Sequence, residues 1–287
     1  MTLDQVHTPP DPGYARGDAL VEPDWLRAHL HDRDLRLVEV DVSAAAYEAG
    51  HIDGAVLWNV YTDLKDPEYQ FVGHAAFEQL VRRSGIAPSS TVVFYGYAPA
   101  MGLWLMRLFG HRDVRILNCS REEWERGGRP LTAAPSEVEA SAYRLPDRQA
   151  PIRASLPLVQ AAIADPACAI IDVRSDAEFH GQVFWPSGGS EPGGRAGHVP
   201  SALHVPVDGL HDQRGAYRDA AALRGAFAAL GSRAPDASRV ITYCTIGGRA
   251  ATAWFVLTDL LGHEGVCVYE GSWAEWGRSP TTPVTCS

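Results

Sequence analysis

The chain has 287 residues, about twice the length of a typical single domain, so we expect two domains. Hydrophobic residues make up 46% of the chain and charged residues 21%, which is ordinary for a globular protein and excludes global disorder. The net charge of −10 disfavours nucleic acid and anionic membrane surfaces as partners. No apolar run reaches the roughly 18 residues of a membrane span, and the first residues lack the pattern of a signal peptide, so we expect a cytoplasmic protein.

Strand and helix patterns alternate along the chain. Residues 1–17 come before the first pattern, and we expect them to form a flexible tail. Short runs of apolar, β-branched residues predict buried parallel strands at residues 37–40, 92–95, 169–173 and 240–243. Helical patterns predict helices at residues 24–31, 75–83, 99–109, 220–230 and 249–261. This alternation predicts an α/β fold with mostly parallel sheets flanked by helices.

The chain contains two copies of one pattern. Five pairs of segments match in the same order: VEVDVS with IIDVRS, GHI with GHV, VVFYG with VITYC, LFGH with LLGH, and SREEW with SWAEW. Matches that keep their order over about 130 residues indicate a tandem duplication. We therefore expect a first domain over residues 18–132, a linker rich in Ala, Pro, Ser and Glu over residues 133–152, and a second domain over residues 153–287.

The chain has five cysteines: Cys119, Cys168, Cys244, Cys267 and Cys286. An odd number without closely paired spacing disfavours a disulfide framework and a zinc site, so we expect no metal. The useful question is therefore which cysteine lies in an environment that activates its thiol.

Cys244 lies in such an environment. It opens the loop Cys244-Thr245-Ile246-Gly247-Gly248-Arg249, which follows a buried strand and precedes a helix. The two glycines let successive backbone N–H groups turn inward to form an anion-binding nest, and the helix N-terminus adds its positive dipole end. Arg249 adds a permanent positive charge. All three effects favour the thiolate and predict a nucleophilic cysteine.

At this loop the chain resembles the tandem-domain rhodaneses, a family of sulfurtransferases. The segments that carry the resemblance are IIDVRSDAEF, GHVPSALHVP, VITYC with its following loop, and YEGSWAEWG. The resemblance implies two rhodanese-like domains, of which the first is inactive because Gly96 stands where the second has Cys244. It also implies a ping-pong cycle that needs no cofactor. In that cycle Cys244 takes a sulfane sulfur from thiosulfate as a persulfide and passes it to cyanide or a thiol.

Several residues are candidates for binding the substrate. We expect the backbone of residues 245–249 to stabilise negative charge on the thiolate and the persulfide. Two roles stay open for Arg249: binding the donor's sulfonate, or bracing the loop against a carboxylate. Arg195, in an insertion over residues 182–196, is either an anion clamp at the pocket mouth or an exposed loop arginine. Phe184 and Trp185 of the same insertion are candidates for an apolar wall over the entrance.

Four polar residues of the second copy are predicted to be structural. Asp172 and His198 recur as Asp41 and His51 in the inactive copy, where catalysis does not need them. Arg174 and Glu178 are spaced for an i,i+4 ion pair on one helix.

Three other functions stay open. A 3-mercaptopyruvate sulfurtransferase resembles C-G-[ST]-G-V-T at this loop, whereas here Ile246 replaces the hydroxyl residue and Glu191-Pro192 lacks the arginine that usually follows. A cysteine phosphatase has five residues between its cysteine and arginine, one more than separate Cys244 from Arg249. A sulfur carrier or binding module would take sulfur from, or pass it to, a protein partner.

Overall fold

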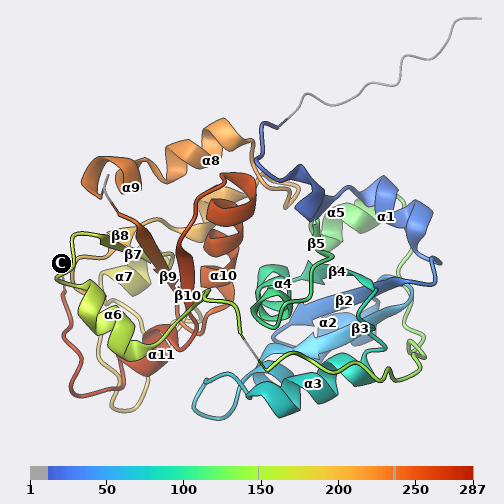
Figure 1. The fold of residues 1–287 in the computed structure, drawn as a ribbon, viewed down its shortest axis with the longest axis horizontal. Helices are drawn as coiled ribbons and strands as arrows, with labels where there is room; N and C mark the ends of the chain where they lie inside the picture. Colours follow the sequence, from blue (N-terminus) through green and yellow to red (C-terminus); the bar gives the residue numbers. More distant parts are fainter. Residues whose placement is uncertain (1–11, 148, 235–236, 287) are drawn as a thin grey trace, which may run out of the picture.

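The computed structural model describes residues 12–147, 149–234 and 237–286. They form two α/β domains, each built on a sheet of five parallel strands (Figure 1). The strand order is β1-β5-β4-β2-β3 in the first domain and β6-β10-β9-β7-β8 in the second. The two orders correspond strand for strand, as the tandem duplication predicts.

The first domain contains β1 (Leu20–Val21), α1 (Pro23–His29), β2 (Leu35–Asp41), α2 (Ala44–Ala49), β3 (Ala55–Asn59), the π-helix η2 (Val60–Leu64), α3 (His74–Arg83), β4 (Thr91–Gly96), α4 (Pro99–Leu108), β5 (Val114–Leu117) and α5 (Arg121–Arg126). The second contains β6 (Arg153–Ala154), α6 (Leu156–Ala162), β7 (Cys168–Asp172), α7 (Asp176–Phe179), β8 (Leu203–His204), α8 (Ala220–Ala226), α9 (Ala228–Arg233), β9 (Arg239–Tyr243), α10 (Gly248–Phe255), the π-helix η4 (Val256–Leu260), β10 (Val266–Tyr269) and α11 (Ser272–Trp276). Short 3₁₀ turns lie at Gly17–Ala19 and Val207–Leu210.

The predicted elements differ from the observed ones mainly at two helices. The single helix predicted over residues 220–230 is wrong, because the chain breaks it at Phe227, whose ψ of 16° ends α8 before α9 begins. The helix predicted over residues 249–261 continues from α10 into the π-helix η4. Together α10 and η4 span residues 248–260 and are longer than the corresponding helix α4 of the first domain.

The two domains share one apolar interior. Helices α4 and α10 pack against each other between the two sheets (Figure 1). The largest cluster of buried apolar side chains includes residues of both helices and of strands from both sheets. An ion pair between Arg107 of α4 and Asp259 of η4, 2.5 Å long, also crosses this interface. The interface is therefore built like the inside of a domain, and neither half is expected to be stable alone.

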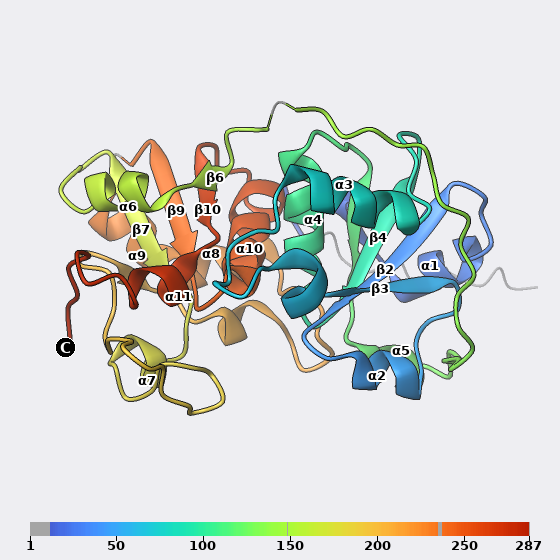
Figure 2. The ribbon, with the colours of Figure 1, turned by 90° about the horizontal axis from the view of Figure 1, so that it is seen from below.

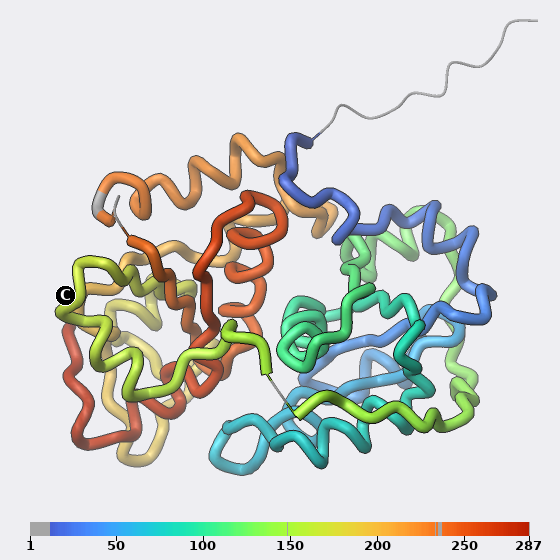
Figure 3. The backbone as a smooth tube through the Cα atoms, viewed as in Figure 1, coloured from blue at the N-terminus to red at the C-terminus, as the bar shows by residue number. Residues whose placement is uncertain are grey.

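The expected flexible tail is wrong for residues 12–17. Tyr14 donates its hydroxyl to the carbonyl of Arg218 at 2.9 Å, and the backbone N–H of Ala15 donates to Leu260 at 2.9 Å. Arg16 pairs with Asp259 at 3.1 Å. Figure 3 shows this segment lying against the second domain before the chain enters the first. The rest of the expected tail, residues 1–11, lies outside the described residues.

The segment expected as a linker is bound along the first domain. Ser141 donates its N–H to the carbonyl of Arg82 at 2.9 Å, and Leu145 donates to the carboxylate of Glu78 at 3.0 Å. In Figure 2 the segment runs beside α3 before it reaches β6. Tyr143 and Leu145 are buried there.

Candidate active site

The Cys244 loop joins β9 to α10, at the carboxyl end of a central strand. Parallel α/β sheets place their sites at such ends. Gly247 caps α10 with a φ of 96°, a backbone angle that residues with a side chain rarely adopt. A Cβ atom there would also come within 2.8 Å of the carbonyl oxygen of Glu270. The bend turns the N–H of Gly247 toward the sulfur of Cys244, to which it donates at 3.1 Å. The sulfur thus lies in a backbone cradle at a helix N-terminus, a position that favours negative charge.

The start of α11 holds the backbone of Cys244 in place. Cys244 donates its N–H to the hydroxyl of Ser272 at 3.1 Å, and its carbonyl accepts the N–H of Trp273 at 2.9 Å. The next carbonyl, that of Thr245, accepts the N–H of Ala274 at 2.9 Å. Ser272 has a φ of 51°, a strained conformation for a residue with a side chain. These bonds fix the loop before any substrate arrives.

Arg249 braces the loop against a carboxylate. Its two terminal nitrogens donate to the two oxygens of Glu178, on α7, at 2.8 and 2.7 Å. Glu178 also accepts the hydroxyl of Thr245 at 2.6 Å. Burial raises the pKa of Glu178, but the bonds from Arg249 and Thr245 outweigh it and lower the pKa to about 2. Of the two roles open to Arg249, the geometry shows the brace.

The predicted pair of Arg174 with Glu178 is wrong. Arg174 is fully buried and bonds instead to Asp172 at the end of β7, 2.7 Å away. Because residues 174 and 178 fall on either side of the cap of the short helix α7, their side chains do not meet as they would within one long helix.

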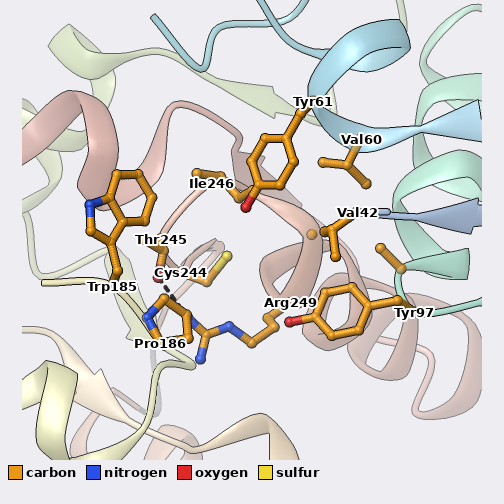
Figure 4. A pocket seen from close by; sticks show the side chains of 12 residues that line it. Val42, Val60, Tyr61, Tyr97, Trp185, Pro186, Cys244, Thr245, Ile246 and Arg249 are labelled. Atoms are coloured by element: carbon orange, nitrogen blue, oxygen red, sulfur yellow. Dashed lines mark hydrogen bonds between the residues drawn. The ribbon is translucent and has the colours of Figure 1, made fainter. Parts of the chain in front are cut away.

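Cys244 is among the side chains of a pocket that both domains line (Figure 4). The volume of the pocket is about 50 Å³, enough for a few water molecules or a compact anion. The second domain contributes Trp185, Pro186, Cys244, Thr245, Ile246, Gly248 and Arg249, and the first contributes Val42, Val60, Tyr61, Tyr97 and Ala98. Among these lining residues only Arg249 is charged, and Glu178 occupies its guanidinium.

Two phenols of the first domain face the loop. Figure 4 shows the hydroxyl ends of Tyr61 and Tyr97 directed into the pocket. Tyr61 and Tyr97 keep 44% and 61% of their surface exposed, so both remain accessible from the pocket. Burial of the ring is the main cause that raises the pKa of each hydroxyl, so both remain protonated at neutral pH and can donate hydrogen bonds.

Two regions of the chain, residues 22–126 and 155–279, match the family description "Rhodanese-like domain". The chain belongs to this family. It is 38% identical over 291 residues to "Putative thiosulfate sulfurtransferase SseA" of Mycobacterium tuberculosis, an alignment that covers 99% of this chain and 96% of the relative. It is 36% identical over 282 residues to "Sulfur carrier protein TtuD" of Thermus thermophilus, covering 95% and 98%. Family and relatives together support sulfurtransferase activity for this rhodanese-like protein.

Solved structures of the same fold exist at low sequence identity. A crystal structure of YnjE superposes with a TM-score of 0.81 at 23% identity, covering 94% of this chain and 68% of that one. An anaerobic ergothioneine biosynthesis enzyme from Chlorobium limicola superposes with a TM-score of 0.81 at 20% identity, covering 96% and 71%. Both show the fold alone. Among the described residues of the rhodanese-like chain, no helix has the length and apolar character to span a membrane.

The candidate residues of this rhodanese-like protein fall into three groups. Cys244, Thr245, Ile246, Gly248 and Arg249 all line the pocket, and Gly247 donates to the sulfur. Trp185 lines the pocket, whereas Phe184 packs in the core of the second domain. Arg195 lies elsewhere: its guanidinium donates to the carbonyls of Trp276 and Thr282, at 3.1 and 2.6 Å, and holds the C-terminal segment.

Asp172 and His198 have the structural surroundings that their repetition predicts. Asp172 is buried and accepts bonds from Arg174 and from the hydroxyl of Tyr243. The ring of His198 stacks on Phe179 with centroids 3.8 Å apart, and its Nδ1 lies 3.0 Å from the carbonyl of that residue. Neither side chain lines the pocket.

Sequence reasoning missed Glu178 as the partner of Arg249, and it missed the wall that the first domain supplies. For Glu178 a signal existed, because a buried arginine at the end of a catalytic loop requires a carboxylate nearby. For Val42, Val60 and Tyr61 no local signal existed, because their place at the pocket depends on how the domains pack.

Proposed function

We propose that the protein transfers the sulfane sulfur of thiosulfate to cyanide or a thiol through a persulfide on Cys244. The observation that carries the proposal is the position of the Cys244 sulfur. It lies 3.1 Å from the backbone nitrogen of Gly247, close to the start of α10, and Cys244 lines a small pocket. That arrangement stabilises one negative charge on sulfur, which is what both the thiolate and the persulfide carry.

The proposed cycle has two displacements at sulfur. The Cys244 thiolate attacks the outer sulfur of thiosulfate, a new S–S bond forms, and the old S–S bond breaks with its electron pair leaving on sulfite. The acceptor then attacks the outer sulfur of the persulfide. Cyanide leaves as thiocyanate and a thiolate leaves as its persulfide, while Cys244 returns to the thiolate. The two displacements balance with thiosulfate, the Cys244 thiolate and the acceptor alone, and need no additional proton, electron or cofactor.

The pocket offers uncharged hydrogen-bond donors to the sulfonate group of thiosulfate. Because Arg249 is engaged by Glu178, we assign the sulfonate oxygens to the protonated hydroxyls of Tyr61 and Tyr97. A compact anion suits a pocket of about 50 Å³. Thiosulfate is also the substrate in the name of the M. tuberculosis relative.

The alternatives have less support. A cysteine phosphatase would need a free guanidinium fork to bind two oxygens of the phosphate, and Arg249 donates both terminal nitrogens to Glu178. Ile246, which lines the pocket, presents no hydroxyl of the kind that the 3-mercaptopyruvate pattern carries. A role as sulfur carrier uses the same persulfide and is favoured by one observation, the similarity to the T. thermophilus relative named as a sulfur carrier protein.

The proposal is tested by offering the protein each substrate class separately. Thiosulfate and 3-mercaptopyruvate are mixed with the reduced protein, and intact mass is followed with time, while p-nitrophenyl phosphate is assayed for phosphate release. We expect addition of one sulfur atom, faster with thiosulfate, and no phosphate release. Cyanide should then remove the sulfur as thiocyanate. Phosphate release, or faster loading from 3-mercaptopyruvate, would overturn the proposal; loading without release to cyanide or small thiols would favour the carrier.

A further inference from the structure

Lys65 is the only lysine among the 25 lysine and arginine residues of the chain, and its side chain is fully buried. It follows the π-helix η2 of the first domain. Its ammonium donates to the carboxylate of Glu270 at 2.5 Å and to the carbonyl of the same residue at 2.9 Å. A buried ammonium is costly unless it is paired, and a compact ammonium reaches two oxygens of one residue where a planar guanidinium would need more space.

Glu270 directly follows β10 in the other domain, so this pair crosses the interface. Its second carboxylate oxygen accepts a bond from Arg153 at 2.7 Å, and Arg153 lies over the ring of Phe71 of the first domain at 6.0 Å. Burial raises the pKa of Glu270, but Lys65 first and Arg153 second outweigh it and lower the pKa below its usual value. The carboxylate therefore stays ionised and holds two cations.

The backbone of Glu270 lies against the Cys244 loop. Gly247 packs so closely on it that a Cβ atom would come within 2.8 Å of the Glu270 carbonyl oxygen and 3.1 Å of its Cα. Lys65 donates to that same carbonyl oxygen. The residues that follow Glu270 include Ser272 and Trp273, which bond to the N–H and the carbonyl of Cys244. The position of Glu270 thus bears on both the donor to the sulfur and the backbone of the nucleophile.

We propose that Lys65 is a positioning residue for Cys244: the silent domain, through the Lys65–Glu270 pair, holds the backbone that aligns the Gly247 N–H and the Cys244 sulfur for attack. The proposal rests on the proposed function for its kinetic readout. It assigns the first domain a part in the rate of sulfur transfer that is separate from lining the pocket. A misplacement of the nucleophile by about 1 Å can slow a displacement reaction about a hundredfold.

The test compares Lys65→Met with a matched control, Arg107→Met. Both changes remove a cation from a buried ion pair across the interface, but Arg107 pairs with Asp259 and contacts neither Glu270 nor the loop. The rate of persulfide formation is measured by quenched-flow mass spectrometry over a range of thiosulfate concentrations. We expect Lys65→Met to lower the maximal rate roughly ten- to a hundredfold, with the half-saturating concentration changed less than about twofold, and Arg107→Met to change the maximal rate less than about threefold.

Two results would overturn the proposal. Equal loss of rate in both variants would show that Lys65 only holds the domains together. A change confined to the half-saturating concentration would show that Lys65 acts on the pocket wall instead of the nucleophile.

Two further measurements are planned: the first covers the case in which one variant does not fold, and the second does not depend on the proposed function. If Lys65→Met lacks a cooperative thermal transition, Glu270→Gln tests the same link. Where all variants fold, we compare the losses in maximal rate of persulfide formation in Lys65→Met, in Glu270→Gln and in the double variant. These losses should be strongly non-additive. Alkylation of Cys244 by iodoacetamide, followed by peptide mass mapping, needs no sulfur transfer. We expect it to slow roughly tenfold in Lys65→Met and not in Arg107→Met. Additive losses would contradict the positioning role. Unchanged alkylation would also contradict it, even if the wild-type protein formed no persulfide.

Discussion

The ends of β4 and β9 are the same place in two copies of one fold, and only one of them carries a nucleophile. β9 leads through Cys244 to α10 at Gly248, whereas β4 ends at Gly96 and its loop is shorter, with α4 beginning at Pro99. Gly96 has a φ of 101°, and a Cβ atom there would come within 2.9 Å of the carbonyl oxygen of Val40. Pro99 lacks the N–H that a nest would need. The first copy keeps the scaffold without the cradle.

What surrounds the two strand ends is shared. The hydroxyl of Tyr95 accepts the N–H of Ile52 at 3.1 Å, and that of Tyr243 accepts the N–H of Val199 at 3.1 Å. The residue after Gly96 is Tyr97, which lines the pocket of the other copy. Duplication has therefore left one strand end for chemistry and turned the other into part of the wall around it.

The largest expected effect comes from trying to convert the first strand end into the second. Cys244→Ser should abolish thiocyanate formation, since a serine alkoxide is not populated in a nest that suits a thiolate. Adding Gly96→Cys to that variant should restore nothing, because the new side chain would press on Val40 and find no free N–H groups. The measurement is cyanide-dependent turnover in both variants, with circular dichroism to verify folding. Turnover regained by the double variant would show that the loop after Gly96 can also support a catalytic cysteine, and would contradict the difference between the two copies.

Separating the copies should have the next largest effect. A fragment of residues 150–287 keeps the Cys244 loop but loses the helix α4 that covers α10, and with it Lys65 and the tyrosines of the pocket. We expect poor solubility or a markedly higher half-saturating concentration of thiosulfate, because the apolar interface becomes exposed. Solubility and donor titration are compared with the full chain. A soluble fragment with full affinity would show that the first domain is dispensable.

The Arg249–Glu178 pair distinguishes the two copies further, because the loop after Gly96 contains no arginine and α4 begins with Pro99. Arg249→Ala should lower kcat/KM about ten- to a hundredfold, and Arg249→Lys should recover only part of that loss, since lysine lacks the bidentate fork. If Arg249 acts by bracing, Glu178→Gln should cost nearly as much. Steady-state kinetics of the three variants decide: full activity in Glu178→Gln would return Arg249 to the role of binding the donor.

Acid titration gives a second readout of the same brace. The folded pKa of Glu178 is about 2, below its ordinary value of 4.5. A depressed carboxyl pKa adds stability that is complete above the ordinary value and is lost as pH falls through about 2. Thermal melting between these pH values should therefore show a loss in wild type that is smaller in Glu178→Gln.

The smallest expected effect concerns the wall. Tyr61→Phe and Tyr97→Phe each remove one hydroxyl from the pocket and leave the ring. A neutral hydrogen bond contributes about 0.5–1.5 kcal/mol, so the half-saturating concentration of thiosulfate should rise roughly two- to tenfold while the maximal rate stays nearly unchanged. Donor titration by thiocyanate release checks both values. Unchanged titration in both variants would limit the first domain to packing.

Much of this comparison could be predicted from the sequence, because it depends on local chemistry. The repeated segments predict two parallel α/β units, and the loop from Cys244 to Arg249 predicts a nest at a helix N-terminus from its glycines and its place after an apolar run. The repetition of Asp172 and His198 as Asp41 and His51 predicts their structural surroundings for the same reason: a residue kept in a copy without a nucleophile is serving the fold.

The remainder depends on contacts between segments far apart in the chain. The sequence allows Arg195 a role at the pocket, because a guanidinium can bind an anionic substrate. In the structure its guanidinium donates instead to backbone carbonyls of the C-terminal segment. Glu178 was assigned to Arg174 by spacing along one helix, whereas tertiary packing pairs it with Arg249. Lys65 and Glu270 pair across the two domains although they lie 205 residues apart in the sequence. No periodicity or motif predicts such a pair.

The most direct test of the central claim is the position and number of sulfur atoms after loading. Wild-type protein is treated with thiosulfate, freed of excess donor, alkylated and mapped by peptide mass spectrometry, alongside Cys244→Ser and a variant in which Cys286, the exposed thiol, is replaced by serine. The account predicts one transferable sulfur per chain, on Cys244, unchanged in the Cys286→Ser control and absent in Cys244→Ser. Transferable sulfur on Cys119 of the first domain, or any that survives in Cys244→Ser, would contradict it.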